Sequence, residues 1–149
     1  MKKIFVLFIF CLGIQTLSAQ RILSSSEIDQ CQTVEAVAWN FVTSIIEKDW
    51  DKMESLASSE FLGILQNAKK KAGCTSYDEY FNRAYIHDIV EMRPLLSQGY
   101  KLIITGISPI SVYFDCDGAN SSYVNDKYDS DTRVIMVQIN DNWKVGGFK

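Results

Sequence analysis

Apolar residues recur every three or four positions between Ser24 and Lys48, and this spacing places them on one face of a helix. They are Ile28, Cys31, Val34, Val37, Ala38, Phe41 and Ile45, with Val42 and Ile46 widening the stripe. Ser24 and Glu27 stand three residues apart and match a capping box at the start of the stripe. The pattern predicts one long amphipathic helix over residues 24–48 that lies in a concave surface.

Three shorter helices are expected after this one. Asp49 opens a turn into the first, and the second covers residues 59–71 and ends at Gly73. Ser76 and Glu79 form a further capping box ahead of the third. Helices therefore dominate the chain as far as about residue 84.

The period then changes to the alternation that is typical of strands. Residues 85–93 alternate until Pro94, which has no amide hydrogen to give to a ladder. Residues 100–114 are rich in Ile, Val, Tyr and Phe, and Gly106 and Pro109 interrupt them. This stretch predicts a strand with a bulge or a bend.

The end of the chain predicts a hairpin. Residues 132–139 and 143–148 have strand character, and the Asn and Asp residues at 140–142 tolerate the left-handed turn between them. A polar, acidic loop is expected over 115–131. Helices first and an antiparallel sheet afterwards place the chain in the α+β class.

The first nineteen residues have the pattern of an export signal. Lys2 and Lys3 precede an apolar run over residues 4–14, and small residues stand before a cleavage point between Ala19 and Gln20. As a helix that run would be about 16 Å long, well short of the ~30 Å core of a bilayer. We therefore expect a signal peptide over 1–19 and a single domain over 20–149 in the periplasm or outside the cell, with no membrane span once the signal is cleaved. An uncleaved anchor is the alternative.

Removal of the signal makes the chain more acidic. It takes away two basic residues and no acidic ones, so the formal net charge goes from −3 to −5. The one basic cluster, Lys69 to Lys71, falls at the end of a predicted helix, where cations complement the helix dipole. Nucleic acid is therefore not an expected partner.

Three cysteines remain after cleavage, so at least one is unpaired within a monomer. Cys31 falls on the apolar helix face, whereas Cys74 and Cys116 lie at the ends of predicted elements. That pair is the better disulfide candidate, and the absence of any disulfide is an equal alternative. No CxxC motif occurs, so a redox role is not expected.

Three features carry a family resemblance. The long N-terminal helix, the turn over residues 47–53 and the closing hairpin of residues 134–139 and 143–148 resemble the nuclear-transport-factor-2-like superfamily, and the likeness covers about residues 27–149. The resemblance implies a cone in which a curved antiparallel sheet wraps the long helix and leaves a pocket. It also implies homodimers through the sheet. Enzymes, binding proteins and scaffolds all share that fold, so it does not fix the function.

The catalytic candidates are few. His87 is the only histidine, and as strand neighbours His87 and Asp88 point to opposite faces and form no dyad. By the resemblance, Asp88 is a candidate general base, with Tyr85, Tyr100 and Tyr113 as candidate donors. The alternatives are a solvated carboxylate and tyrosines that only pack.

Asp115 and Asp117 are the metal candidates. They begin an oxygen-rich loop, but its glycine comes fourth, whereas a calcium loop places glycine sixth. A solvated acidic loop is the favoured interpretation, and no metal or cofactor is expected.

The sequence therefore favours an exported, non-catalytic domain that binds a small ligand, a peptide or a partner protein in the cell envelope. A small lyase or isomerase of the ketosteroid-isomerase-like type, with Asp88 as base, is the first alternative. A domain that neutralises a toxin by binding it is the second.

Overall fold

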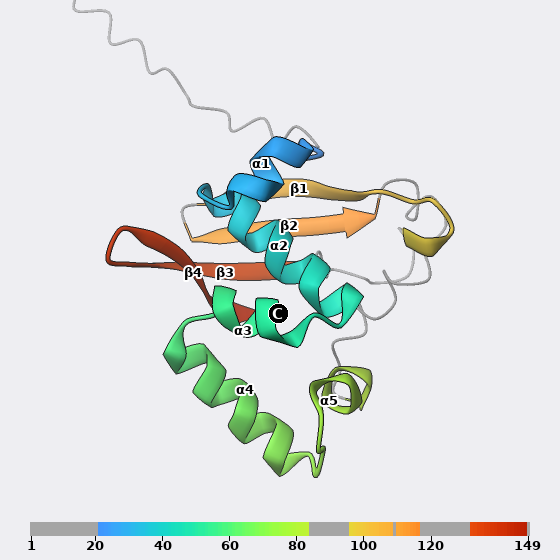
Figure 1. The fold of residues 1–149 in the computed structure, drawn as a ribbon, viewed down its shortest axis with the longest axis vertical. Coiled ribbons are helices and arrows are strands. Elements are labelled where there is room, and N and C mark those ends of the chain that lie inside the picture. Colours follow the sequence, from blue (N-terminus) through green and yellow to red (C-terminus); the bar gives the residue numbers. More distant parts are fainter. Residues whose placement is uncertain (1–20, 84–95, 109, 117–131, 149) are drawn as a thin grey trace, which may run out of the picture.

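The computed structural model describes residues 21–83, 96–108, 110–116 and 132–148. Within these ranges, five helices precede a four-stranded antiparallel sheet, which confirms the α+β class (Figure 1). The helices are α1 (Ser25–Gln30), α2 (Val34–Glu47), α3 (Trp50–Leu56), α4 (Ser59–Lys71) and α5 (Tyr77–Arg83). The strands are β1 (Leu102–Ser108), β2 (Ser111–Cys116), β3 (Thr132–Ile139) and β4 (Asn142–Phe148).

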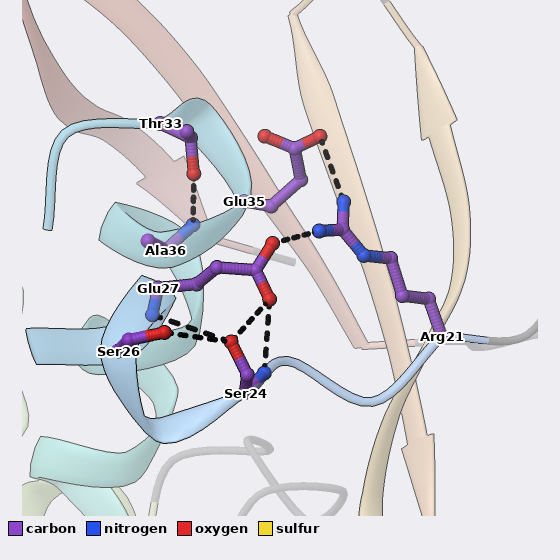
Figure 2. Close-up of polar contacts among 7 residues, drawn as sticks. All are labelled: Arg21, Ser24, Ser26, Glu27, Thr33, Glu35 and Ala36. Atoms are coloured by element: carbon purple, nitrogen blue, oxygen red, sulfur yellow. Dashed lines mark hydrogen bonds and ion pairs between the residues drawn. The ribbon is translucent and has the colours of Figure 1, made fainter. Parts of the chain in front are cut away.

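The single helix predicted over 24–48 is in fact two helices, α1 and α2. The capping box at Ser24 and Glu27 is present and begins α1, with each residue accepting the other's backbone amide hydrogen (Figure 2). Cys31 then takes a left-handed conformation with φ of 48°, which ends α1. Thr33 caps α2 by accepting from the amide of Ala36 at 3.2 Å (Figure 2).

Asn40 joins the two helices across this break. Its side-chain amide, on α2, donates to the carbonyl of Ile28 on α1 at 2.8 Å and to that of Ala36 at 2.9 Å. Asn40 is buried, so the two bonds satisfy a group that would otherwise be costly in the core. The bond to Ile28 fastens α1 to α2, and the apolar residues of both helices face the same core.

The three shorter helices are confirmed. Asp49 caps α3 by accepting from the amide of Lys52 at 3.1 Å. Gly73, with φ of 69°, follows α4 as predicted. At α5 only half of the predicted capping box forms, because Ser76 accepts from the amide of Glu79 but the Glu79 carboxylate accepts from the amide of Thr75.

The stretch predicted as one strand over 100–114 is a hairpin of β1 and β2. The two strands pair antiparallel from Leu102 opposite Cys116 to Ser108 opposite Ser111. Their register shifts between Ile104 and Gly106, where the sequence predicts a bulge. The chain therefore reverses between Ser108 and Ser111, which pair with each other.

The second hairpin forms as predicted. β3 and β4 pair across Asn140 and Asp141, whose φ angles of 49° and 63° are those of a tight hairpin turn. The sheet order is β1-β2-β3-β4, and the sheet is open. The strand predicted over 85–93 lies outside the described residues.

The core lies between α2 and one face of the sheet (Figure 1). Phe41 and Ile45 from α2 are fully buried with Phe114 and Val134 from the sheet. Trp39 also packs on Phe114, edge to face, with ring centroids 6.1 Å apart. Core packing is thus the role of Trp39, and α2 is the central helix of the fold.

Both edges of the sheet are partly covered by other segments. At β1, Arg21 and Ile104 exchange backbone hydrogen bonds of 2.9 and 2.8 Å. The Arg21 guanidinium also pairs with the carboxylates of Glu27 and Glu35 (Figure 2). At β4, the amide of Ser58 donates to the carbonyl of Val145 at 2.8 Å. Such contacts discourage pairing with other chains at these points.

Candidate functional site

Three segments that are far apart in the sequence enclose a cleft of about 780 Å³. They are the α1–α2 connection at residues 31–32, the α3–α4 connection at 56–59 and the β3–β4 turn at 139–144, with Val37 at the base. These connections lie at the same end of the sheet (Figure 1). We call this cavity the hairpin cleft.

Trp143 forms the aromatic wall of the hairpin cleft. Alternate residues of a strand point to the same side, so Trp143 shares the helix-covered side of the sheet with the buried Val145. Trp143 is itself half-buried and packs against the edge of the core. Leu56 is half-buried beside it in the lining, so this wall is apolar and only partly shielded from water.

The rest of the α3–α4 connection, residues 57–59, also lines the cleft and is fixed to β4. The bond from the Ser58 amide to Val145 makes Ala57 a parallel bridge partner of that residue. The Ser58 hydroxyl accepts from the amide of Phe61 at 3.2 Å, so it is used as the cap of α4. The exposed Ser59 hydroxyl lies at the mouth.

Lys144 adds a second tie between β4 and this wall. Its ammonium group donates to the carbonyl of Ser55, in the last turn of α3. A cation suits that position, because the last carbonyls of a helix lack partners and carry partial negative charge. Lys144 therefore has a structural role in shaping the hairpin cleft.

Cys31 supplies the thiol in the lining. Burial raises the pKa of this half-buried group, while the ammonium groups of Lys52 and Lys144 and a hydrogen bond with Asn40 act in the opposite direction. The net shift is upward, so the group is a neutral thiol at pH 7. Cys31 is thus a slow nucleophile at the wall of the cleft.

Of the catalytic and metal candidates, the structure describes Tyr100, Tyr113 and Asp115. Outside the described residues are Ala19, Gln20, Tyr85, His87, Asp88 and Asp117. Tyr100 is exposed just before β1, and Tyr113 lies on β2 with the Arg133 guanidinium 5.7 Å from its ring centre. Neither tyrosine lines the hairpin cleft.

Asp115, the other metal candidate, belongs to β2 instead of a loop. One of its carboxylate oxygens accepts from the amide of Cys116 at 2.7 Å. Across the described ranges, no three or more His, Cys, Asp or Glu side chains group together in a way that would hold a metal ion.

Cys74 and Cys116, the candidate disulfide pair, are both free cysteines in the structure, which corresponds to the alternative without a disulfide. Cys74 follows α4, where its thiol donates to the carbonyl of Ala72 at 3.7 Å. Cys116 is the last residue of β2, and the α4–α5 connection that carries Cys74 lies well away from that end of the sheet (Figure 1). Burial and the neighbouring Asp115 carboxylate raise the pKa of Cys116 to about 11.

The sequence offered only one signal for this cleft. The residues at 140–142 are recognisable as a turn, but nothing in the local pattern joins them to residues 31–32 or 56–59. Those contacts arise only in the folded chain, where α1 packs against α2 and α4 packs against β4.

Comparison with known proteins adds no relative: no family model, no curated protein and no solved structure matches this chain. In the part of the chain that the structure describes, none of the helices has the length and apolar character needed to cross a membrane. The fold and the cleft together define an α+β domain with an open antiparallel sheet and a cavity of ligand size.

Proposed function

We propose that this chain is an exported, non-catalytic binding domain that holds a small ligand in the hairpin cleft. The observation that carries the proposal is the cleft itself. Its volume of about 780 Å³ falls in the range of ~300–1,000 Å³ that is common for small-molecule sites. Backbone bonds fix its walls, so little ordering is required when a ligand enters.

The chemistry of the lining favours binding over catalysis. The titratable side chains of the described lining are Cys31, Asp141 and Lys144. Cys31 has a raised pKa, Asp141 is exposed at the turn, and Lys144 is engaged with the carbonyl of Ser55. A general acid–base mechanism needs groups that are free to exchange protons with a substrate, and the raised pKa of Cys31 and the engaged ammonium of Lys144 do not favour one here.

Export and family membership belong to the same proposal. The basic start, apolar run and small residues of the first nineteen positions support secretion into the periplasm or beyond the cell. The residues of the closing hairpin, together with the packing of α2 on an antiparallel sheet, support membership of the nuclear-transport-factor-2-like superfamily. Two copies would then associate through the sheet.

Protection of Cys31 from alkylation tests the binding site directly. Trypsin releases residues 22–48 as a peptide with Cys31 as its single cysteine, so mass spectrometry follows this thiol alone. We expect some members of a diverse small-molecule library to raise the melting temperature and to slow alkylation of Cys31. The buried Cys116 is the internal control, and it should stay unmodified with or without ligand.

The proposal would be contradicted if every compound that raises the melting temperature left the alkylation rate of Cys31 unchanged. Such compounds would bind elsewhere. The same conclusion would follow if substitution of Trp143 by Phe had no effect on the affinity of any compound, since this indole lines the cleft.

A further inference from the structure

The polar groups of the hairpin cleft are mostly neutral amides and hydroxyls. Gln32, Ser59 and Asn142 come from its three segments, and all three are exposed. An amide side chain offers both donors and acceptors, and so does a hydroxyl. Asn142 donates one amide hydrogen to the carbonyl of Asn140 at 3.0 Å, and the amide group has further capacity to donate and accept.

Charge contributes little to this surface. Asp141 and Lys144 are the two charged residues in the described lining, and their formal charges cancel. The ammonium of Lys144 is already bound to the carbonyl of Ser55. A strongly anionic or cationic ligand therefore finds no dedicated partner here.

Two apolar residues of the lining are deeply buried. Val37 is 3% exposed and Ala57 is 6% exposed, so neither offers much surface to a ligand. The accessible apolar groups of the lining are the half-buried Trp143 and Leu56 and Ile139, which is 43% exposed. The cleft therefore combines one aromatic side chain with several neutral polar groups.

One position of this sheet edge is already occupied, which limits the addition of a peptide strand. The carbonyl of Val145 in β4 accepts from the amide of Ser58, and the Lys144 side chain crosses to the carbonyl of Ser55. Addition of a strand needs such groups to be free.

A sugar ring has the two kinds of surface that this lining matches. The C–H hydrogens of one ring face carry partial positive charge and suit the negative face of an indole. Its hydroxyl groups both donate and accept around the rim, as amides and hydroxyls do. We therefore propose that the hairpin cleft binds a neutral carbohydrate, stacked on Trp143 and held at its edge by Gln32, Ser59 and Asn142. This inference rests on the proposed binding function.

An array of neutral mono- and oligosaccharides, followed by calorimetry of the best sugar with the full chain, tests the inference. We expect W143A to weaken binding tenfold or more. Gln32→Ala removes about one hydrogen bond and should weaken binding about fivefold. Gln32 is exposed, so this variant remains informative even if W143A fails to fold. Asn67→Ala is the matched control, because Asn67 is an exposed amide on α4 outside the cleft, and it should bind as the parent does.

Other ligand classes separate the two proposals. Trialanine and decanoate are tested in parallel, with alkylation of Cys31 as the common measure of occupancy. If either protects Cys31 while no sugar on the array does, the carbohydrate inference is overturned and the binding site stands. The inference is likewise overturned if a sugar binds without slowing the alkylation of Cys31 and its affinity is unchanged in Gln32→Ala. The sugar would then be held elsewhere.

Discussion

At the scale of single residues, the second hairpin depends on two glycines in β4. Gly147 stands opposite Ile135 in the register, and Gly146 falls where that register shifts. A side-chain carbon built on Gly146 would meet Val137 Cγ1 at 2.5 Å, and one on Gly147 would meet Ile135 Cδ1 at 3.1 Å. Glycine is needed here because the side chains of β3 lie over the backbone of β4. This close approach helps to position the strand that carries Trp143.

Gly146→Ala should therefore destabilise the fold by about 1–3 kcal/mol, the usual cost of forcing an extra carbon into a packed site. Chemical denaturation measures it. Gly63→Ala is the matched control, because open space surrounds Gly63 within α4 and alanine there should stabilise by about 0.5–1 kcal/mol. Adding Val137→Ala to Gly146→Ala should recover part of the loss. An unchanged free energy of unfolding for Gly146→Ala would show that β4 does not lie as close to β3 as described.

At the scale of elements, local signals were predictable and long-range ones were not. The cap at Ser24, the start of α3 at Asp49 and the turn at residues 140–141 involve near neighbours in the sequence, so a short pattern reveals them. The sequence does not predict the break between α1 and α2, because the apolar spacing continues across it. The bond from Asn40 to the carbonyl of Ile28, which joins the two helices, is a long-range contact that the local pattern does not show. The sequence does not predict the hairpin cleft either, since no local pattern joins its three segments.

α5 illustrates how an element is attached by tertiary contacts. The rings of Phe81 and Trp50 stack with centroids 5.8 Å apart and planes 7° from parallel. Tyr77 donates its hydroxyl to the carboxylate of Glu54 on α3 at 2.8 Å, and the Lys69 ammonium lies 4.4 Å from its ring centre. These aromatic and polar contacts hold α5 against α3 and the end of α4.

Tyr77 makes this attachment sensitive to alkaline pH. Burial, followed by the hydrogen bond to Glu54 and the charge of Glu54, raises the pKa of Tyr77 from 10.0 to about 12. A raised folded-state pKa favours the neutral form, so the stabilisation is complete below pH 10 and is lost as pH rises to about 12. We expect the free energy of unfolding to fall across this interval, and to fall less steeply in Tyr77→Phe.

The measurement is denaturation at several pH values between 8 and 12. Tyr77→Phe should also be less stable at pH 7 by about 1 kcal/mol, because Glu54 loses a donor. Tyr80→Phe, on the same helix, is the control and should follow the parent slope. Parallel slopes for Tyr77→Phe and the parent would show that Tyr77 ionises no differently in the folded and unfolded chains.

At the scale of the whole molecule, the folded domain is anchored almost at the predicted cleavage point. Arg21 pairs with Ile104 at the edge of β1, and its side chain reaches Glu27 and Glu35 (Figure 2). Leu23 follows and is 4% exposed in the core. A cut after Ala19 leaves all of these contacts in place, so an export signal over residues 1–19 is compatible with a complete domain after its removal.

Two truncations test this division of the chain. A chain that begins at Gln20 should unfold at the same temperature as the full chain. A chain that begins at Ser24 loses the buried Leu23 and the Arg21 bridge, which should cost about 3 kcal/mol or more and lower the melting temperature by roughly 10 °C. Export of the full chain from a bacterial host should give a product whose intact mass begins at Gln20. If the chain that begins at Gln20 unfolds as early as the shorter one, residues 1–19 contribute to the fold and are not a removable signal.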